Sequence, residues 1–280
     1  MNYKKSTGEK VFSAFNLFFL CLFGLICVYP IVYILAVSFS GSLAVMEGRV
    51  WLYPVDFHLK AYEIVFSNDN ILRAYLNTLL YTVIGTGFNL AAITCAAYPL
   101  SKKRLRGRSG FSLYFVFTIL FSGGMVPNFL LIQKLGFYDT IWAVTVPGAV
   151  SVFYMIILRT NFEQIPDALE EAAIIDGMND LQILFRIFIP LSLPIYAALI
   201  LFFAVGHWNS FFDAFIYLQT KSRYPLQVIL KEIVTANTLN DLGNSAVGQS
   251  AMETTELVGE NLKCATIIVV MLPVMMVYPF

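Results

Sequence analysis

The stretch VFSAFNLFFLCLFGLICVYPIVYILAVSF, residues 11–39, contains no charged side chain, and the next charged residue is Glu47. About 20 consecutive apolar residues suffice for a helix to cross the hydrocarbon core of a bilayer. Lys4, Lys5 and Lys10 precede the stretch, in the charge layout of a secretory signal peptide. The apolar run is too long for a signal peptide, however, and it lacks a clear cleavage site with small residues. We therefore expect an uncleaved first transmembrane helix.

The composition of the whole chain agrees with a membrane protein. Hydrophobic residues make up 58% of the 280 residues and charged residues 13%, whereas a soluble domain carries roughly 25% charged residues. The 18 basic residues balance the 18 acidic ones, so no excess positive charge is available for nucleic acid. The cysteines lie within apolar runs without the paired spacing of a metal site. Together these features exclude a soluble globule, a disordered chain and a nucleic-acid-binding protein.

Further charge-free runs follow the first, and they predict an all-α polytopic membrane protein with six transmembrane helices. The predicted spans are residues 11–39, 74–100, 109–132, 140–158, 187–212 and 264–280. Prolines lie inside or near the ends of these runs, which is ordinary in membrane helices and predicts kinks.

The orientation follows from the distribution of Lys and Arg. The segment KKRLRGR, residues 102–108, lies between the second and third spans, and cytoplasmic loops carry such an excess of positive charge. With six spans, both termini are then cytoplasmic, and residues 40–73, 133–139 and 219–263 lie outside. The loop 159–186 is expected in the cytoplasm although it is more acidic than basic.

The loop 159–186 is longer than two antiparallel spans need, and its sequence is helical in character. Pro166 takes a plausible first helical position, acids fill the first turn, and Gly177 stands where a left-handed residue ends a helix. A turn of about 100° per residue predicts two faces. These are Asp167, Glu170, Glu171, Ile174 and Met178 on one face, and Ala168, Leu169, Ala172, Ala173 and Ile175 on the other.

A second helix is expected from Asn179 or Asp180 to Pro190, which opens the fifth span. Its predicted apolar stripe consists of Leu181, Leu184, Phe185 and Phe188.

This loop resembles a known family. Glu171-Ala172-Ala173, three residues, Gly177, nine residues and Ile187-x-Ile189-Pro190 are similar to the EAA loop in the membrane subunits of type I ATP-binding-cassette (ABC) importers. The chain departs from that pattern only in Ile189, where the family has leucine. The context from Ile165 to Pro194 resembles the carbohydrate-uptake branch, especially the MalG-like subunit of a heterodimeric pair. The segments 77–78, 123–127 and 208–212 are also similar to such permeases.

The resemblance implies that residues 166–177 form a coupling helix seated in a cleft of a cytosolic ATPase, with Glu171 paired to a basic group there. The implied coupling residues are Glu170, Glu171, Ala172, Ala173, Asp176, Gly177, Ile187 and Pro190. It further implies a first helix and external segment over residues 1–72. A type I transmembrane domain over residues 73–280 follows, with the EAA loop at 159–190. Such permeases continue beyond the equivalent of Phe280, so a cytoplasmic tail is expected.

The expected assembly follows from the same resemblance. Its other members are a second, homologous permease, two copies of a cytosolic ABC ATPase and an extracytoplasmic solute-binding protein. The chain has no phosphate-binding P-loop motif, so it is expected to be no enzyme and to bind no cofactor or metal. ATP and Mg²⁺ are expected on the ATPase. The substrate is expected to be a carbohydrate, most simply an oligosaccharide, and the location the bacterial cytoplasmic membrane, in contact with its lipid.

Candidate residues for the sugar path combine polar and aromatic side chains. His207, Trp208, Asn209 and Asp213 form the densest such group near a membrane boundary, but Trp208 and Asp213 also fit an interfacial belt in contact with water. Asn89 and Asn128 are weaker candidates.

The outer segment 236–248 is rich in amide and small residues and is expected to be an exposed loop. Similarity to maltose-type permeases implies that this loop probes a docked binding protein. The expected contact residues are Asn237, Asn240 and Asn244, and a solvated connection without a partner is the alternative.

Two other classes of function remain open from the sequence. A secondary transporter or channel for a small polar solute would act alone, but the spans contain no acidic or basic residue well inside them as a site for a coupling ion. A structural membrane anchor would not need a helical cytosolic loop of this length. Co-purification of an ATPase distinguishes these classes from an ABC permease.

Overall fold

The computed structural model describes residues 7–243 and 259–277. These residues form helices and connecting loops and contain no strand, which confirms the all-α prediction. They divide into two compact units. One is formed by the residues up to Ile71 together with those from Leu230 onward, and the other by Leu72–Ile229. The predicted domain boundary after residue 72 concerns family domains and stays a prediction.

The first unit joins the two ends of the described chain. It contains α1 (Thr7–Ser38), α2 (Ser42–Met46), α3 (Lys60–Ser67) and α16 (Gly259–Val277), and α16 packs against the other three. The Ser40 hydroxyl donates to Ala36 O over 2.6 Å, and the Asn261 amide on α16 donates to Ser40 O. These bonds hold the end of α1 against the start of α16.

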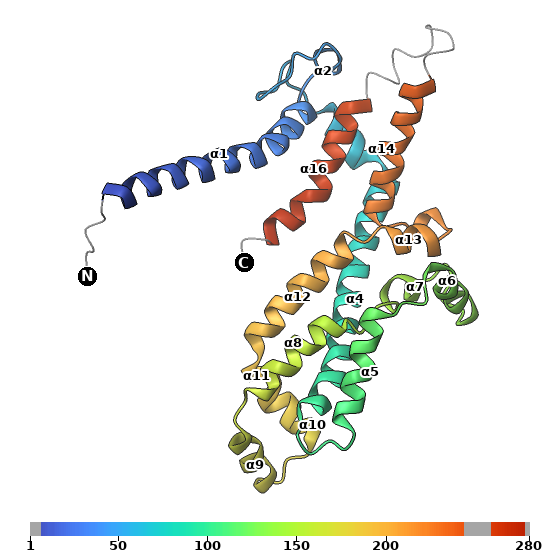
Figure 1. Cartoon of the computed structure of the whole chain (residues 1–280). Helices are drawn as coiled ribbons and strands as arrows, with labels where there is room; N and C mark the ends of the chain where they lie inside the picture. The colour runs from blue at the N-terminus through green and yellow to red at the C-terminus, as the bar shows by residue number, and fades with distance from the viewer. Residues whose placement is uncertain (1–6, 244–258, 278–280) are drawn as a thin grey trace. The chain divides into compact units, whose positions relative to one another are not determined.

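The second unit contains α4 (Asp69–Ser101), which continues from the first, and a series of shorter helices (Figure 1). These are α5 (Arg108–Leu120), α6 (Met125–Lys134), α7 (Trp142–Thr145), α8 (Val152–Glu163), α9 (Asp167–Ile175), α10 (Asp180–Ile183), η1 (Leu184–Phe188), α11 (Ile189–Leu191), α12 (Leu193–Trp208), α13 (Phe212–Tyr217) and η2 (Lys221–Arg223). Helix α14 (Leu226–Gly243) begins in this unit and continues into the first.

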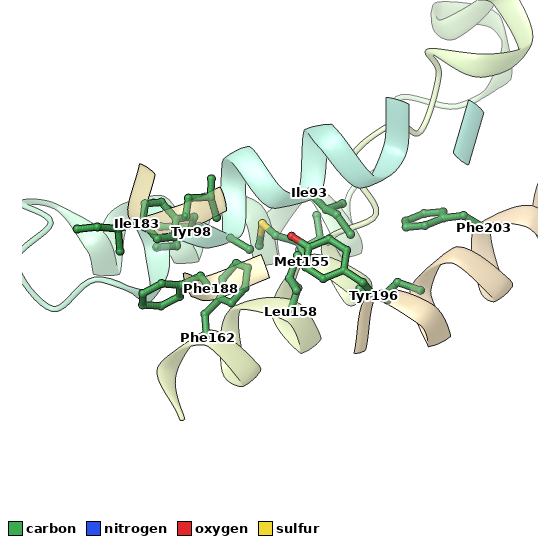
Figure 2. Packing of buried hydrophobic residues seen from close by; sticks show 14 of the residues in the cluster. Ile93, Tyr98, Met155, Leu158, Phe162, Ile183, Phe188, Tyr196 and Phe203 are labelled. Carbon is green, nitrogen blue, oxygen red and sulfur yellow. The ribbon is translucent and has the colours of Figure 1, made fainter. Parts of the chain in front are cut away.

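The core of this unit forms where α4, α8, η1 and α12 meet (Figure 2). Tyr98, Phe162 and Phe188 pack edge to face, with ring centroids 5.2 to 6.2 Å apart. Farther along the cluster, the Thr94 hydroxyl lies 2.7 Å from the Tyr196 hydroxyl, which joins α4 to α12. The core therefore links the last turns of α4 to the helices that follow α9.

The predicted spans are only partly single helices. In the described part of the chain, α1 and α4 are each long and apolar enough to cross a membrane. Residues 109–132 instead form α5 and α6, bent by 114°. The span predicted for residues 140–158 is divided into α7 and α8, and α12 starts at Leu193 after an 82° bend from Asp180–Leu191.

Glycine and proline account for the breaks. Gly124 and Gly148 adopt φ values of 87° and 73°, in the left-handed region that a helix cannot continue through. Pro190 and Pro194 flank the bend before α12 and lack the N–H that an uninterrupted helix needs. A charge-free run therefore predicts that its residues lie within the membrane, but it does not show whether they form one straight helix or a bent pair.

The break before α8 is compensated by a side chain. The Asn89 amide on α4 donates to Gly148 O and Ala149 O, over 3.4 and 2.9 Å, and so supplies a partner for carbonyl groups that the break leaves outside a helix. His207 Nε2 on α12 lies 2.6 Å from Asn89 Oδ1. This bond requires a close approach of α12 to α4 at Gly85, where a Cβ atom would lie 2.5 Å from the His207 ring.

We predict that Gly85→Ala destabilises the protein by roughly 1–3 kcal/mol, because the added methyl group forces the His207 ring away from Asn89. The measurement is the thermal unfolding midpoint of the purified protein in detergent. Gly87→Ala is the matched control, since a Cβ atom at Gly87 meets nothing within 4 Å. Equal midpoints for Gly85→Ala and the wild type would show that α4 and α12 do not depend on this approach.

Candidate functional site

Helix α9 lies at the same end of the second unit as α10 and the loop between α4 and α5 (Figure 1). Pro166 is its N-cap residue, one position earlier than predicted, and the helix starts at Asp167. Gly177 has a φ of 79°, which confirms the predicted left-handed stop. Gly177 N and Met178 N donate to Ile174 O and Ala173 O, both over 3.0 Å, and so close the last turn.

The two faces predicted for α9 need correction. Ala173 is buried in the core cluster, and Glu170 points the same way, so these two residues mark the inner face. Ala168, Glu171, Ala172 and Ile175 share the outer face, and Ile175 is 86% exposed. Glu170 and Glu171 were expected side by side, but successive helical residues differ in direction by about 100° and the core selects only one of them.

Glu170 is held by a basic residue of the same chain. Its Oε2 lies 2.6 Å from Lys102 Nζ, and the two side chains are only 15% and 10% exposed. The Lys102 ammonium also lies 3.6 Å from the ring centroid of Phe188 and 4.4 Å from that of Tyr98. Burial lowers the pKa of Lys102, and the hydrogen bond and charge of Glu170 oppose that shift.

More ion pairs connect the basic segment 102–108 to the acidic loop. Arg104 pairs with Glu170 and Asp180, Lys103 with Asp167, and Arg108 and Arg159 both with Glu163. Most of these side chains are more exposed than Lys102, so each pair contributes little to stability. Together they place the most basic and the most acidic segments of the chain against each other, which explains how an acidic loop and a basic loop share one end of the unit.

The outer face of α9 remains accessible. No ion pair or hydrogen bond of the Glu171 side chain is present among the described residues, and Glu171 and Ile174 border a cleft of about 470 Å³. Asp176 and Gly177 are exposed at the end of the helix. Glu170 was predicted to contact an ATPase, but its carboxylate already binds Lys102. Ile175, the most exposed large hydrophobic residue on α9, was not among the predicted coupling residues.

The segment after α9 differs from its predicted helix. Asn179 caps α10 through a reciprocal pair of bonds with Gln182, as a boundary at this position requires. Ile183, Leu184 and Phe188 are buried, whereas Leu181 and Phe185 are exposed, so the predicted stripe is wrong. The reason is the π-helical turn of η1, which widens the period that the prediction assumed.

The last two coupling residues of the sequence motif lie in this turn. Ile187 packs against the core and Pro190 belongs to α11, just before the bend into α12. Both residues therefore lie in the connection to α12, and neither is part of the outer face of α9.

The candidate path residues separate into two groups. His207 bonds Asn89, and Trp208 is buried with its ring edge-on to Tyr75, at 5.6 Å between centroids. These three predicted path residues therefore join helices. Asn209 is exposed and accepts a bond from the Gln227 amide over 3.3 Å.

The remaining path candidates lie apart. Asp213 is half-buried on α13, and Asn128 is exposed on α6. No hydrogen bond in the described part of the chain joins Asn128 to the His207 group.

The connection from α13 to α14 is firmly held. Asn77 Nδ2 donates to Ser222 O over 2.8 Å, and the Thr78 hydroxyl accepts from Leu226 N over 2.7 Å. Asp139 accepts bonds from Gln219 N, Thr220 and Arg223. Burial raises the pKa of Asp139. The bonds from Thr220 and Gln219 and the charge of Arg223 lower it by more, so the pKa lies below its usual value.

The predicted outer loop at residues 236–248 is helical over its first half. Asn237 and Asn240 lie within α14, and Asn244 lies outside the described residues. Extending an existing helix needs no new nucleus, so the weak propensities of Asn and Thr do not end it.

Comparison with known proteins identifies the chain. No family model matches it. It is 41% identical, over 264 residues, to the polygalacturonan/rhamnogalacturonan transport system permease protein YtcP of Bacillus subtilis, covering 94% of this chain and 90% of the relative. It matches one chain in the crystal structure of a bacterial ABC transporter that imports the acidic polysaccharide alginate. That match has 36% identity and a TM-score of 0.90, and covers 99% of this chain and 98% of the other. The chain belongs to the permease subunits of ABC transporters.

Two consequences follow for this permease. The chain is an integral membrane protein, and its relatives are transport permeases rather than enzymes. A second solved structure, of a bacterial alginate ABC transporter in complex with an alginate-bound periplasmic protein, has 14% identity and a TM-score of 0.61. That match covers 99% of this permease and 96% of the other chain, and it shows the shared fold.

Proposed function

We propose that this permease forms half of the translocation pathway of an ATP-driven importer for an oligosaccharide. The observation that carries the proposal is α9, a short helix that the chain anchors on one face and leaves accessible on the other. Ala173 and Glu170 hold the inner face, while Glu171, Ala172 and Ile175 face outward. An exposed apolar side chain on a rigidly held helix suits insertion into a partner protein better than contact with water.

The partner at α9 is a cytosolic ATPase. Ile175 supplies an apolar anchor, and the free carboxylate of Glu171 meets a basic group in the ATPase cleft. Two ATPase copies carry ATP and Mg²⁺, because this permease has no P-loop. When ATP closes the ATPase pair, α9 follows as a rigid body and changes the access to the pathway.

Two further partners complete the importer. A second, homologous permease supplies the other half of the pathway. An extracytoplasmic solute-binding protein delivers the sugar, in line with the periplasmic protein bound in the similar transporter. Its contacts on this permease lie around α14, with Asn237, Asn240 and Asn244 as the expected residues. Among the path residues, Asn209 is the best candidate for a sugar contact, because His207 and Trp208 already serve to join helices.

The permease crosses the bacterial cytoplasmic membrane six times, with both termini in the cytoplasm. In this topology the six spans are α1, α4, the bent pair α5–α6, α7 together with α8, residues 187–212 across the bend before α12, and α16. Its support is the pairing of residues 102–108 with the loop that contains α9, because paired segments lie on the same side of the membrane and the basic one belongs inside.

The substrate is an oligosaccharide of acidic sugars. The transport system of YtcP is named for polygalacturonan and rhamnogalacturonan, and the similar solved transporter imports alginate, described as acidic. The six predicted spans of this permease contain no Asp or Glu. A negatively charged sugar therefore meets no like charge along them.

We predict that Glu171→Lys abolishes uptake and loses the ATPase on purification from the membrane, while the permease remains inserted at near-normal amounts. Replacing the charge leaves the ATPase basic group unpaired and facing a like charge, which costs about 2 to 5 kcal/mol at the interface. Gly177→Asp is expected to act in the same direction, because a side chain at this φ costs about 1 kcal/mol or more.

The matched control for Glu171→Lys is Gln164→Lys, an exposed residue of the same loop outside α9. It introduces the same charge, and both uptake and bound ATPase should remain. Wild-type uptake and full ATPase retention in Glu171→Lys would reject docking through α9.

We predict on which side of the membrane three positions lie, tested with single cysteines in a chain whose native cysteines are replaced by serine. A cysteine at Arg106 or at Asp176 is shielded from a membrane-impermeant thiol reagent in intact cells, and one at Asn240 is labelled. The measurement is the extent of labelling before and after the cells are opened. Labelling at Arg106 together with protection at Asn240 would invert the orientation.

We predict that the importer prefers trigalacturonate to the neutral maltotriose. In membrane vesicles supplied with ATP and the binding protein, uptake of radiolabelled trigalacturonate should exceed that of maltotriose by about tenfold or more, equivalent to ~1.4 kcal/mol. Faster uptake of maltotriose would show that the substrate is a neutral oligosaccharide while leaving the importer function intact.

A further inference from the structure

The end of α4 and helix α9 are joined at one ammonium group. Lys102 directly follows α4, and its Nζ lies 2.6 Å from Glu170 Oε2 on α9. The ring of Phe188 in η1 lies 3.6 Å from the same nitrogen, and the ring of Tyr98 in α4 lies 4.4 Å from it. Three elements therefore meet at a side chain that is about nine-tenths buried.

A buried ion pair is not needed merely to hold two helices together. Apolar side chains of similar volume often replace such a pair with no loss of stability, because the two charges lose their hydration on burial. What the pair adds is a short, directional contact between two particular atoms. The other pairs of α9 lie largely in solvent, with Lys103 and Asp167 81% and 72% exposed, and they transmit little.

The covalent path from α9 to the membrane helices is indirect. It runs through α10, η1 and α11 and then bends by 82° before α12. The Ser192 hydroxyl at this bend is buried without a hydrogen-bond partner among the described residues, so no side-chain bond from Ser192 stiffens the bend. Backbone bonds from Ser192 N to Phe188 O and from Tyr196 N to Ser192 O cross the bend, so this route to α12 is continuous but changes direction.

The path through Lys102 is direct. It enters α4, which is bonded farther along to α12 by the pairs Thr94–Tyr196 and Asn89–His207, at 2.7 and 2.6 Å. A movement that enters α4 at Lys102 therefore reaches both helices.

We propose that Lys102 is a positioning residue that makes α9 and the end of α4 move as one body when an ATPase displaces α9. Glu170 is its counterpart, so the first glutamate of α9 binds inward and the second, Glu171, faces the partner. This inference rests on the proposed docking of α9 on an ATPase. It adds that the displacement enters the membrane through α4 as well as through α12.

The test compares the distance between α9 and the end of α4 in two states of the whole importer. Spin labels are attached at Arg106→Cys, in the loop after α4, and at Leu169→Cys, beside the outer face of α9, in a complex otherwise free of cysteine. The complex is purified through a tag on this permease. The distance between labels is measured by electron paramagnetic resonance without nucleotide and after trapping with ATP, Mg²⁺ and vanadate.

With Lys102 present, the distance is expected to be the same in both states. In Lys102→Met it should increase on trapping. Lys102→Met/Glu170→Met replaces the pair by apolar side chains and so avoids an unpaired buried charge. The double variant also removes the weaker pair of Glu170 with Arg104, at 3.4 Å, so it should show an increase at least as large as that of Lys102→Met. Lys102→Arg keeps the charge and should restore the constant distance. Lys103→Met, which breaks the exposed pair with Asp167, is the matched control and should also keep it.

A constant distance in both Lys102→Met and the double variant would overturn the inference, as would a distance that changes on trapping with Lys102 in place. In both cases the ATPase still co-purifies, so the proposed function stands. If the wild-type permease co-purifies with no ATPase, the proposed function and this inference fail together.

Discussion

The buried ion pair between Lys102 and Glu170 is the constraint on which the orientation of α9 depends. Two charges removed from water require each other, and removing one partner of such a pair typically costs about 3–5 kcal/mol. Because Glu170 faces Lys102, α9 has only one orientation in which Ala173 reaches the core. Glu171 and Ile175 are then on the outside. The surface offered to a partner is thus decided by a contact on the opposite side of the helix.

A second constraint acts within the second unit. Its helices break at Gly124, Gly148 and Ser192, and backbone groups freed at such breaks in a membrane protein need partners from the protein itself. Asn89 satisfies two of the freed carbonyls, and His207 fixes the Asn89 amide in turn. Polar residues that resemble a sugar site in the sequence therefore serve partly to compensate irregular backbone. Exposed polar residues such as Asn209 are the better candidates for contact with a substrate.

Some features of the loop and of α14 could be predicted from local sequence, and others could not. The stop of α9 at Gly177 was predictable because a left-handed residue after a short acidic helix is a local requirement. The inner and outer faces of α9 could not be predicted, because Glu170 and Glu171 carry the same side chain and only the core and Lys102 distinguish their positions. The stripe of the next helix failed because η1 adopts a π-helical turn that no local pattern announces. The helical start of the 236–248 segment was missed because propagation from α14 overrides weak propensities.

The sequence alone determined the helical membrane class, the position of the acidic loop between two charge-free runs and the spacing of Glu171, Gly177 and Pro190. Those properties depend on the transfer of side chains from water to lipid and on backbone preferences, which act over a few neighbouring residues. Only the tertiary structure decided that Lys102 pairs with Glu170 and that His207 bonds Asn89. These contacts join residues 68 and 118 positions apart, and ion pairing and hydrogen bonding at short range require the folded chain to bring the atoms together.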